Sequence, residues 1–117
     1  MNVGIDIVKV SRIGKLSKSR RFLDRVFSED EISYCRNKKN SAQHYAVRFA
    51  AKEAVWKALS KTRTLGVRLT HKDIRINNRK DGMPRIILPR KLKGIQKGLS
   101  ISLSHTREFA VAVAALE

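Results

Sequence analysis

Two carboxylate side chains lie where the sequence pattern is otherwise apolar. Asp6 is inside the alternating segment 3–8, and Glu53 follows Phe49 by four residues on the apolar stripe of a long helical pattern. A buried carboxylate is costly unless a cation or a metal compensates it. Two acids with no third Asp, Glu or His nearby in the sequence suit Mg²⁺, which completes its shell with water and substrate phosphates.

A structural interpretation of the same two acids also fits the spacing. Glu53 can form an ion pair with Lys57, four residues later on the same helix, and Asp6 can meet an arginine of the sheet. The periodicity alone leaves both interpretations open.

Three cations share the predicted helix with Glu53. Arg48 and Lys52 are four residues apart and are expected to project together, and Lys57 lies one turn beyond Glu53. Beside a metal, an arginine would bind phosphate oxygens with its planar fork and a lysine as a point charge. A solvated basic face is the alternative for these residues.

The elements that must position these residues follow from periodicity and turn signals. The first half of the chain predicts a strand at 3–8, a basic helix at 11–23 beginning at Ser11, a short helix capped by Ser28 and Glu31, and a helix at 41–60. The second half predicts a loop at 62–71, strands at 73–77 and 84–88, a short helix at 89–99 and a closing hairpin that turns at 105–108. This order predicts an α+β domain with an antiparallel sheet packed against the long central helix.

The composition limits the class of protein. The chain has 117 residues and 26 Lys and Arg against 10 Asp and Glu, which gives a formal net charge of +16. The length fits one domain over 1–117, the apolar runs are too short to span a bilayer, and a single cysteine excludes an internal disulfide. We expect a soluble, cytoplasmic domain with a polyanionic partner, and charge and size alone put ribosomal-type RNA binding first.

Three blocks of the sequence stand in a characteristic order and spacing. They are Gly4-Ile-Asp6 with Arg12-Ile13, then Phe49-x-x-Lys52-Glu53-Ala54-x-x-Lys57, then Ser102-Leu-Ser-His105-Thr106. Together they closely resemble the holo-acyl-carrier-protein synthases, the small bacterial members of the 4′-phosphopantetheinyl transferase superfamily. The resemblance covers essentially the whole chain.

The resemblance implies a specific reaction. A serine of an apo acyl carrier protein attacks the β-phosphate of coenzyme A, which releases adenosine 3′,5′-bisphosphate and leaves 4′-phosphopantetheine on the carrier for fatty-acid biosynthesis. By family position, Asp6 and Glu53 would hold Mg²⁺, and Lys52 would join them in catalysis. Glu53, directly or through a metal-bound water, would also take the serine proton.

The resemblance also implies which residues contact coenzyme A. Seven positions match: Arg48, Lys52, Lys57, Gly82, Pro84, His105 and Thr106. Met83 replaces the lysine of the family's Gly-Lys-Pro loop, so that cationic contact is lost or is supplied by Arg85. The stretch 59–66 also departs from the family pattern. On the residues alone, His105 is an ordinary hairpin-turn residue.

The resemblance also implies a binding partner for the basic N-terminal region. Acyl carrier proteins are acidic, and the family docks them on arginines that correspond here to Arg12, Arg21 and Arg25. Such complementary charge raises the association rate and weakens with salt, whereas a merely solvated helix would show neither effect. The resemblance further implies a homotrimer in which neighbouring subunits share each active site.

Two other classes of function make different demands on the acids. An RNA-binding module has no use for Asp6 and Glu53 on apolar faces, whereas metal-assisted phosphoryl transfer requires them. A catalytically inactive carrier-binding domain would keep the basic helix but tolerate Glu53→Gln. We therefore expect a transferase, with nucleic acid not the main partner.

Overall fold

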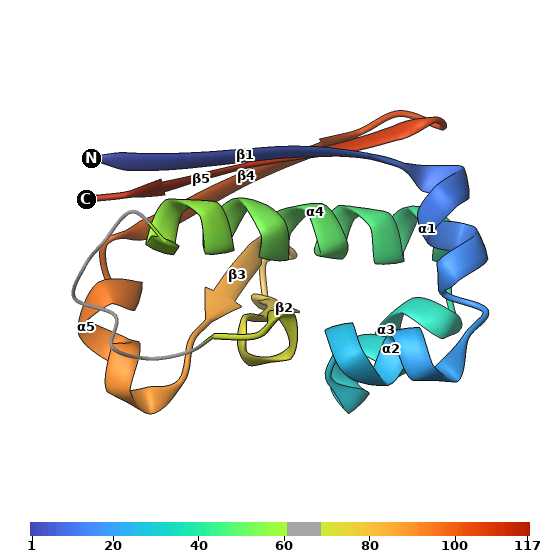
Figure 1. Ribbon diagram of the computed structural model, residues 1–117, viewed down its shortest axis with the longest axis horizontal. Helices are drawn as coiled ribbons and strands as arrows, with labels where there is room; N and C mark the ends of the chain where they lie inside the picture. Colours follow the sequence, from blue (N-terminus) through green and yellow to red (C-terminus); the bar gives the residue numbers. More distant parts are fainter. Residues whose placement is uncertain (61–68) are drawn as a thin grey trace.

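The computed structural model describes residues 1–60 and 69–117. A long helix, α4 (Ser41–Ser60), runs through the centre of the molecule. Figure 1 shows this helix between a sheet on one side and a layer of short helices and a small hairpin on the other. The sheet has the order β1 (Asn2–Lys9), β5 (Phe109–Leu116), β4 (Leu99–His105), with both pairs antiparallel. The predicted α+β class is confirmed.

Small side chains let the sheet lie close to α4. Ala110, Ala112 and Ala114 of β5 are buried on the face that packs on the helix. Helix α4 also has buried alanines, including Ala50, Ala54 and Ala58. Because the side chains between the two layers are small, the sheet and the helix can pack closely. The alanines of the last strand therefore serve the core of this chain.

The outer face of the same sheet is apolar and exposed. Val3, Ile5 and Ile7 of β1 are 43%, 59% and 62% exposed, and Ile5 pairs directly with Val113 of β5. No element of the described residues covers this face, which lies on the side of the sheet away from α4 (Figure 1). The alternation in the sequence identifies the two faces of β1, and the structure shows that the apolar one is the uncovered one.

The N-terminal basic segment is two helices, α1 (Val10–Leu16) and α2 (Arg20–Val26), where the pattern predicts one over 11–23. The prediction is wrong because the hydroxyl of Ser19 accepts a hydrogen bond from the Phe22 amide and begins a new helix. Lys9, not Ser11, precedes α1. The next helix, α3 (Glu29–Arg36), has the predicted capping box of Ser28 and Glu31.

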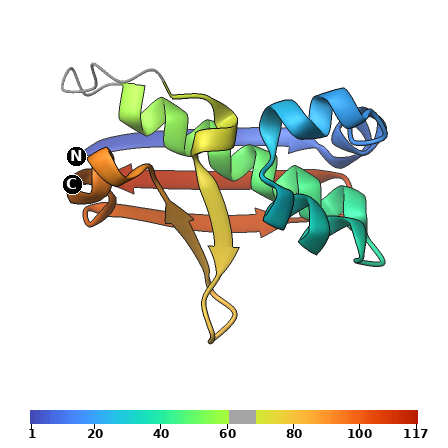
Figure 2. The ribbon, with the colours of Figure 1, turned by 90° about the horizontal axis from the view of Figure 1, so that it is seen from below.

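The second layer is completed by a short hairpin and three short helical turns. The 3₁₀ turn η1 (His71–Asp73) precedes β2 (Arg75–Asn78), so this strand begins later than predicted. Its partner is β3 (Pro84–Ile87), and the turn between them, at whose end Gly82 has a φ of 86°, projects from the body (Figure 2). The helical turn η2 (Arg90–Leu92) and helix α5 (Lys93–Gln96) replace the predicted helix at 89–99.

The closing hairpin of β4 and β5 is confirmed, with its turn at 105–108. The predicted loop at 62–71 falls largely outside the described residues, as does most of the divergent stretch 59–66. Within the described part of the chain, no helix combines the length and the hydrophobicity needed to cross a membrane.

Candidate active site

Strand β1 crosses α4 so closely that residue 4 has no room for a side chain. A Cβ atom at Gly4 would overlap the carbonyl oxygen of Ala54 and lie 2.8 Å from the amide nitrogen of Ala58. Because side chains alternate along a strand, Asp6 points to the same face as Gly4. The glycine of the Gly-x-Asp motif therefore brings an acidic side chain against the helix.

Asp6 has one oxygen paired and one oxygen unpaired. The ammonium of Lys57 donates to Asp6 Oδ1 at 3.2 Å and to the carbonyl oxygen of Ile5 at 2.9 Å. Asp6 Oδ2 is buried and has no hydrogen-bond partner among the described residues. Burial raises the pKa of Asp6, the contact with Lys57 opposes this, and the negative charge of Glu53 raises the pKa further. A buried oxygen without a partner is costly, and a bound cation would remove that cost.

Glu53 is held by a residue that the sequence did not single out. Its Oε1 atom lies 2.8 Å from Nε2 of His71. Lys57 pairs with Asp6 and Glu53 pairs with His71, so both partners named by the structural interpretation of the acids are wrong. No pattern connects His71 to Glu53 in the sequence, because the contact spans 18 residues and depends on the path of the intervening chain.

The acids fit a hard divalent cation better than a transition metal. Among the described residues, no three His, Cys, Asp or Glu side chains converge on one point, as a zinc site would need. Mg²⁺ keeps several waters and takes one or two carboxylates. The unpartnered Asp6 Oδ2, within electrostatic range of Glu53, is the feature of this chain that fits such an ion.

Lys52 occupies a different place from the one predicted. Its side chain is fully buried, and its ammonium donates to Glu31 Oε1 at 2.7 Å and to the carbonyl oxygen of His71 at 3.0 Å. Burial lowers the pKa of Lys52, and the adjacent Glu31 opposes that shift. Because α3 and β2 cover this side of α4, Lys52 is not exposed in this chain, and its predicted catalytic and coenzyme A contacts stay predictions.

Glu31 completes a buried network around Lys52. Its Oε1 atom also accepts from the amide of Ser28 at 2.8 Å, and Oε2 accepts from the amide of Ile76 at 2.7 Å. The pair therefore joins α3, α4, η1 and β2, with the oxygens of the carboxylate satisfied.

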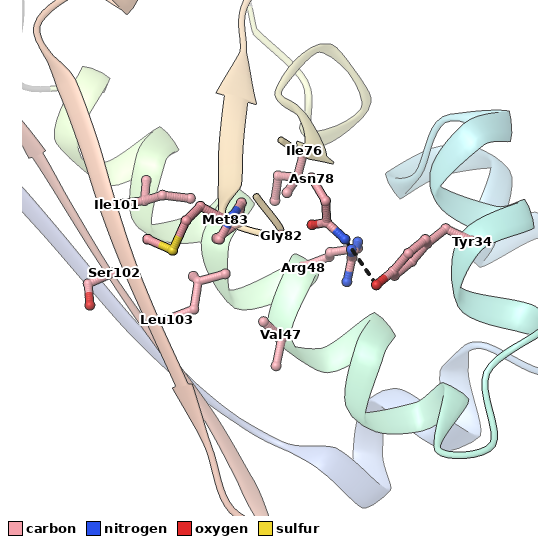
Figure 3. A pocket seen from close by; sticks show the side chains of 11 residues that line it. Tyr34, Val47, Arg48, Ile76, Asn78, Gly82, Met83, Ile101, Ser102 and Leu103 are labelled. Carbon is pink, nitrogen blue, oxygen red and sulfur yellow. Dashed lines mark hydrogen bonds between the residues drawn. The ribbon is translucent and has the colours of Figure 1, made fainter. Parts of the chain in front are cut away.

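A cavity of about 360 Å³ lies beside α4 at Arg48, one helical turn before Lys52. It is lined by Arg48, by Gly82, Met83 and Pro84 next to the β2–β3 turn, and by residues of β4 (Figure 3). The guanidinium of Arg48 stacks over the ring of Tyr34, 4.3 Å from its centroid, and Arg48 Nε is buried without a hydrogen-bond partner in the described chain. This cavity brings together three of the predicted coenzyme A contacts.

Met83 reinforces the apolar character of the cavity. It lines the cavity at the position where the resemblance implies a lysine. Arg85, which could have supplied the missing charge, donates to Asn77 Oδ1 at 2.9 Å and is not among the lining residues. Arg48 is then the cation of this cavity.

The two groups of predicted residues lie on different sides of the central helix. Arg48 and Glu53 are five residues apart on α4, which separates their directions by about 140°. Neither Asp6 nor Glu53 lines the cavity of Arg48. One chain therefore assembles Asp6, Glu53 and Lys57 at one place, and Arg48, Gly82 and Pro84 at another.

The remaining predicted contacts lie at the hairpin turn and on the N-terminal helices. His105 is exposed at the end of β4, and the hydroxyl of Thr106 accepts from the amides of Glu108 and Phe109 at 3.2 and 3.0 Å. The three predicted docking residues are exposed and form no ion pair with a described residue: Arg12, Arg21 and Arg25.

Comparison with known proteins places the chain among transferases of one kind. The sequence profile of the 4′-phosphopantetheinyl transferase superfamily matches residues 2–114. A holo-[acyl-carrier-protein] synthase of Thermodesulfovibrio yellowstonii is 45% identical over 112 residues, which are 94% of this chain and 92% of the relative.

Two solved structures share the fold. The Helicobacter pylori holo-[acyl-carrier-protein] synthase in complex with coenzyme A has a TM-score of 0.79 and 35% identity, covering 98% of this chain and 99% of its own. The Bacillus anthracis enzyme in complex with CoA (3′,5′-ADP) has a TM-score of 0.79 and 32% identity, covering 98% and 94%.

Proposed function

Because the chain belongs to the 4′-phosphopantetheinyl transferase superfamily, we propose that it transfers 4′-phosphopantetheine from coenzyme A to a serine of an apo acyl carrier protein. The products are the holo carrier and adenosine 3′,5′-bisphosphate, and the pathway supplied is fatty-acid biosynthesis. The observation that carries the proposal is the pair of acids, Asp6 and Glu53, that β1 and α4 bring together around Gly4.

Asp6 and Glu53 would hold Mg²⁺ in this reaction. When bound, the ion supplies charge neutralisation for the pyrophosphate of coenzyme A. Lys57, whose side chain is 45% exposed beside Asp6, is the cation placed to bind a phosphate oxygen. Glu53 would act as the base for the attacking serine, directly or through a water, and its carboxylate is partly exposed.

The cavity of Arg48 would receive the nucleotide part of coenzyme A. Its apolar walls suit the adenine ring, and the buried, unpartnered Arg48 Nε suits a phosphate at its edge. The backbone at Gly82 and Pro84 lines the same cavity. His105 and Thr106 would add contacts from the hairpin turn.

In one chain the metal-binding acids lie apart from the cavity of Arg48, and a homotrimer with shared active sites would account for this separation. The exposed apolar face of the sheet, with Val3, Ile5 and Ile7, offers a surface for a second copy. Contact through that face could bring the acids of one subunit to the nucleotide cavity of its neighbour. The acidic carrier would dock nearby on Arg12, Arg21 and Arg25.

Intact-mass spectrometry tests the proposed reaction. An apo acyl carrier protein is incubated with this protein, coenzyme A and Mg²⁺, and a parallel reaction contains EDTA. We expect the carrier to gain the mass of one phosphopantetheine only without EDTA. A folded protein that modifies none of several carriers would contradict the proposal.

A further inference from the structure

The imidazole of His71 makes the contact that fixes the direction of Glu53. Nε2 of His71 lies 2.8 Å from Glu53 Oε1. An ionised carboxylate has no proton to give, so Nε2 carries the hydrogen and donates it. Among the described residues nothing hydrogen-bonds the other oxygen, Oε2, which is left for another ligand.

The imidazole also has a contact that does not involve Glu53. The ring stacks on Phe49, one helical turn before Glu53, with centroids 5.7 Å apart and planes 9° apart. Phe49 in turn stacks on Phe22 of α2, with centroids 6.1 Å apart. The imidazole is therefore held against α4 by a stack of aromatic rings.

The backbone of His71 is also held by a hydrogen bond. The ammonium of Lys52 donates to its carbonyl oxygen at 3.0 Å, and that ammonium is anchored in the buried pair with Glu31. Asp73 Oδ2 accepts from both the amide and the hydroxyl of Thr70 at 3.0 Å, which closes the 3₁₀ turn. A residue fixed in both its ring and its backbone can impose a geometry on its partner.

We propose that His71 is a positioning residue that occupies Glu53 Oε1 and presents Oε2 to the divalent cation beside Asp6. A carboxylate on a helix otherwise loses side-chain freedom when it binds an ion, and a hydrogen bond from a fixed donor removes that cost beforehand. This inference rests on the proposed function, because it assigns the presentation of one of the two metal-binding acids to His71.

Two substitutions of His71 test its hydrogen bond to Glu53 and its stacking on Phe49 separately. His71→Phe keeps a planar ring against Phe49 and removes the N–H donor. His71→Gln loses the ring, but its amide N–H reaches about as far from the backbone as Nε2 of histidine. The pair therefore separates the hydrogen bond from the aromatic packing.

Binding of Mn²⁺ to the full-length protein, measured by the electron paramagnetic resonance signal of free Mn²⁺ without coenzyme A or carrier, is the direct test. We expect His71→Phe to weaken Mn²⁺ binding by about 10- to 100-fold. We expect His71→Gln to restore most of the loss, and Glu53→Gln to bind no more tightly than His71→Phe. Circular dichroism and thermal unfolding check that each variant is folded.

Steady-state transfer supplies a second readout. In His71→Phe the Mg²⁺ concentration for half-maximal rate should rise by a similar factor, while KM for the carrier stays within about twofold of the wild type. A purely structural role would lower kcat and leave the Mg²⁺ concentration for half-maximal rate unchanged.

Several outcomes overturn the inference and are distinguishable from failure of the proposed function. If folded His71→Phe binds Mn²⁺ as tightly as the wild type, or His71→Gln binds as weakly as His71→Phe, His71 does not position Glu53, even where the wild type performs transfer. If the wild type binds no Mn²⁺, the inference fails together with the metal assignment. His71-dependent Mn²⁺ binding in a protein that modifies no carrier supports the inference and contradicts the proposed transfer.

Discussion

The ammonium of Lys57 on α4 lies 3.2 Å from the Oδ1 atom of Asp6 on β1, and this contact joins the two elements that carry the candidate active site. Lys57 satisfies one oxygen of Asp6 and leaves Oδ2 buried without a partner in the described chain. His71 likewise satisfies one oxygen of Glu53. Each acid thus keeps one oxygen for a ligand that neither protein partner supplies.

Glu53→Gln should abolish transfer while the fold is retained. Glutamine keeps the length of the side chain and an oxygen that can accept from His71, but it removes the negative charge. Stabilisation of charge by a metal held on a carboxylate is worth several kcal/mol, so we expect transfer to fall at least about 100-fold. Carrier mass shift against time measures the rate, and Glu108→Gln, a change at an exposed acid, is the matched control. Near-normal turnover in folded Glu53→Gln would remove the metal-site assignment.

Gly4→Ala should destabilise the protein through the packing of β1 on α4. The added methyl group would overlap the carbonyl oxygen of Ala54, and backbone cannot move aside as a flexible side chain can. Overpacking of this kind costs about 1–3 kcal/mol or more of unfolding free energy. Urea unfolding measures the loss.

The matched control for this substitution is Gly94→Ala. Gly94 is exposed in α5, and a Cβ atom there meets nothing within 4 Å. The unfolding free energy of the Gly94→Ala variant should equal that of the wild type or exceed it slightly, because alanine is a better helix former than glycine. Equal effects of the two substitutions would contradict the close approach of β1 to α4.

Lys52→Met and Lys57→Met should separate structure from function on one helix. Lys52→Met leaves Glu31 buried without its charge partner, which costs about 3–5 kcal/mol of unfolding free energy. Lys57→Met removes a partly exposed pair, worth about 1 kcal/mol or less, but it takes away the cation proposed for phosphate binding.

Thermal unfolding and the KM for coenzyme A distinguish the two lysine variants. We expect Lys52→Met to unfold at a markedly lower temperature, and Lys57→Met to unfold near the wild-type temperature with a raised KM for coenzyme A. A Lys52→Met variant that is as stable as the wild type and loses only affinity for coenzyme A would instead support the contact between Lys52 and coenzyme A that the sequence predicts.

The sequence predicts the elements that local patterns specify. The 3.6-residue period of 41–60, the capping box at Ser28 and the alternation of the last hairpin each arise from neighbouring residues, and each is found. The sequence pattern does not predict the break between α1 and α2, because Ser19 lies in a segment whose charge and periodicity continue on both sides.

Local sequence patterns do not predict contacts between residues that lie far apart in the chain. Arg48 and Lys52 share a helix face, but whether that face meets solvent or protein depends on Glu31, 21 residues before Lys52. The contact of Glu53 with His71 depends likewise on the path of the chain after α4. In β1 the alternation identifies two faces, whereas the helix covers the one that carries Gly4 and Asp6 because only that face permits close approach.

Cys35 should be inert toward thiol reagents in the folded protein. It is fully buried, and burial raises the pKa of its thiol to about 11. Since the thiolate is the nucleophile, only about one thiol in a thousand is ionised at pH 8. Labelling with a chromogenic disulfide should be far slower in native buffer than in urea, where unfolding exposes the thiol and removes the cause of the raised pKa. Equal rates in the two conditions would contradict the burial of Cys35.

Arg12→Glu should weaken recognition of the acyl carrier protein without changing the affinity for coenzyme A. Arg12 is exposed on α1 and forms no ion pair within the described chain, so its charge is available to an acidic partner. Reversing a charge at the edge of an interface acts mainly on the association rate. We expect a several-fold rise in KM for the carrier and a weaker dependence of that KM on salt.

Lys91→Glu is the matched control for Arg12→Glu, because it makes the same change of charge on η2, at the end of the molecule opposite to α1 (Figure 1). Steady-state kinetics with carrier and coenzyme A varied in turn give the two KM values for each variant. A specific docking role requires that only Arg12→Glu raises KM for the carrier. Equal rises in both variants would mean that net charge alone attracts the carrier, and a parallel loss of coenzyme A affinity in Arg12→Glu would place Arg12 in the nucleotide site instead.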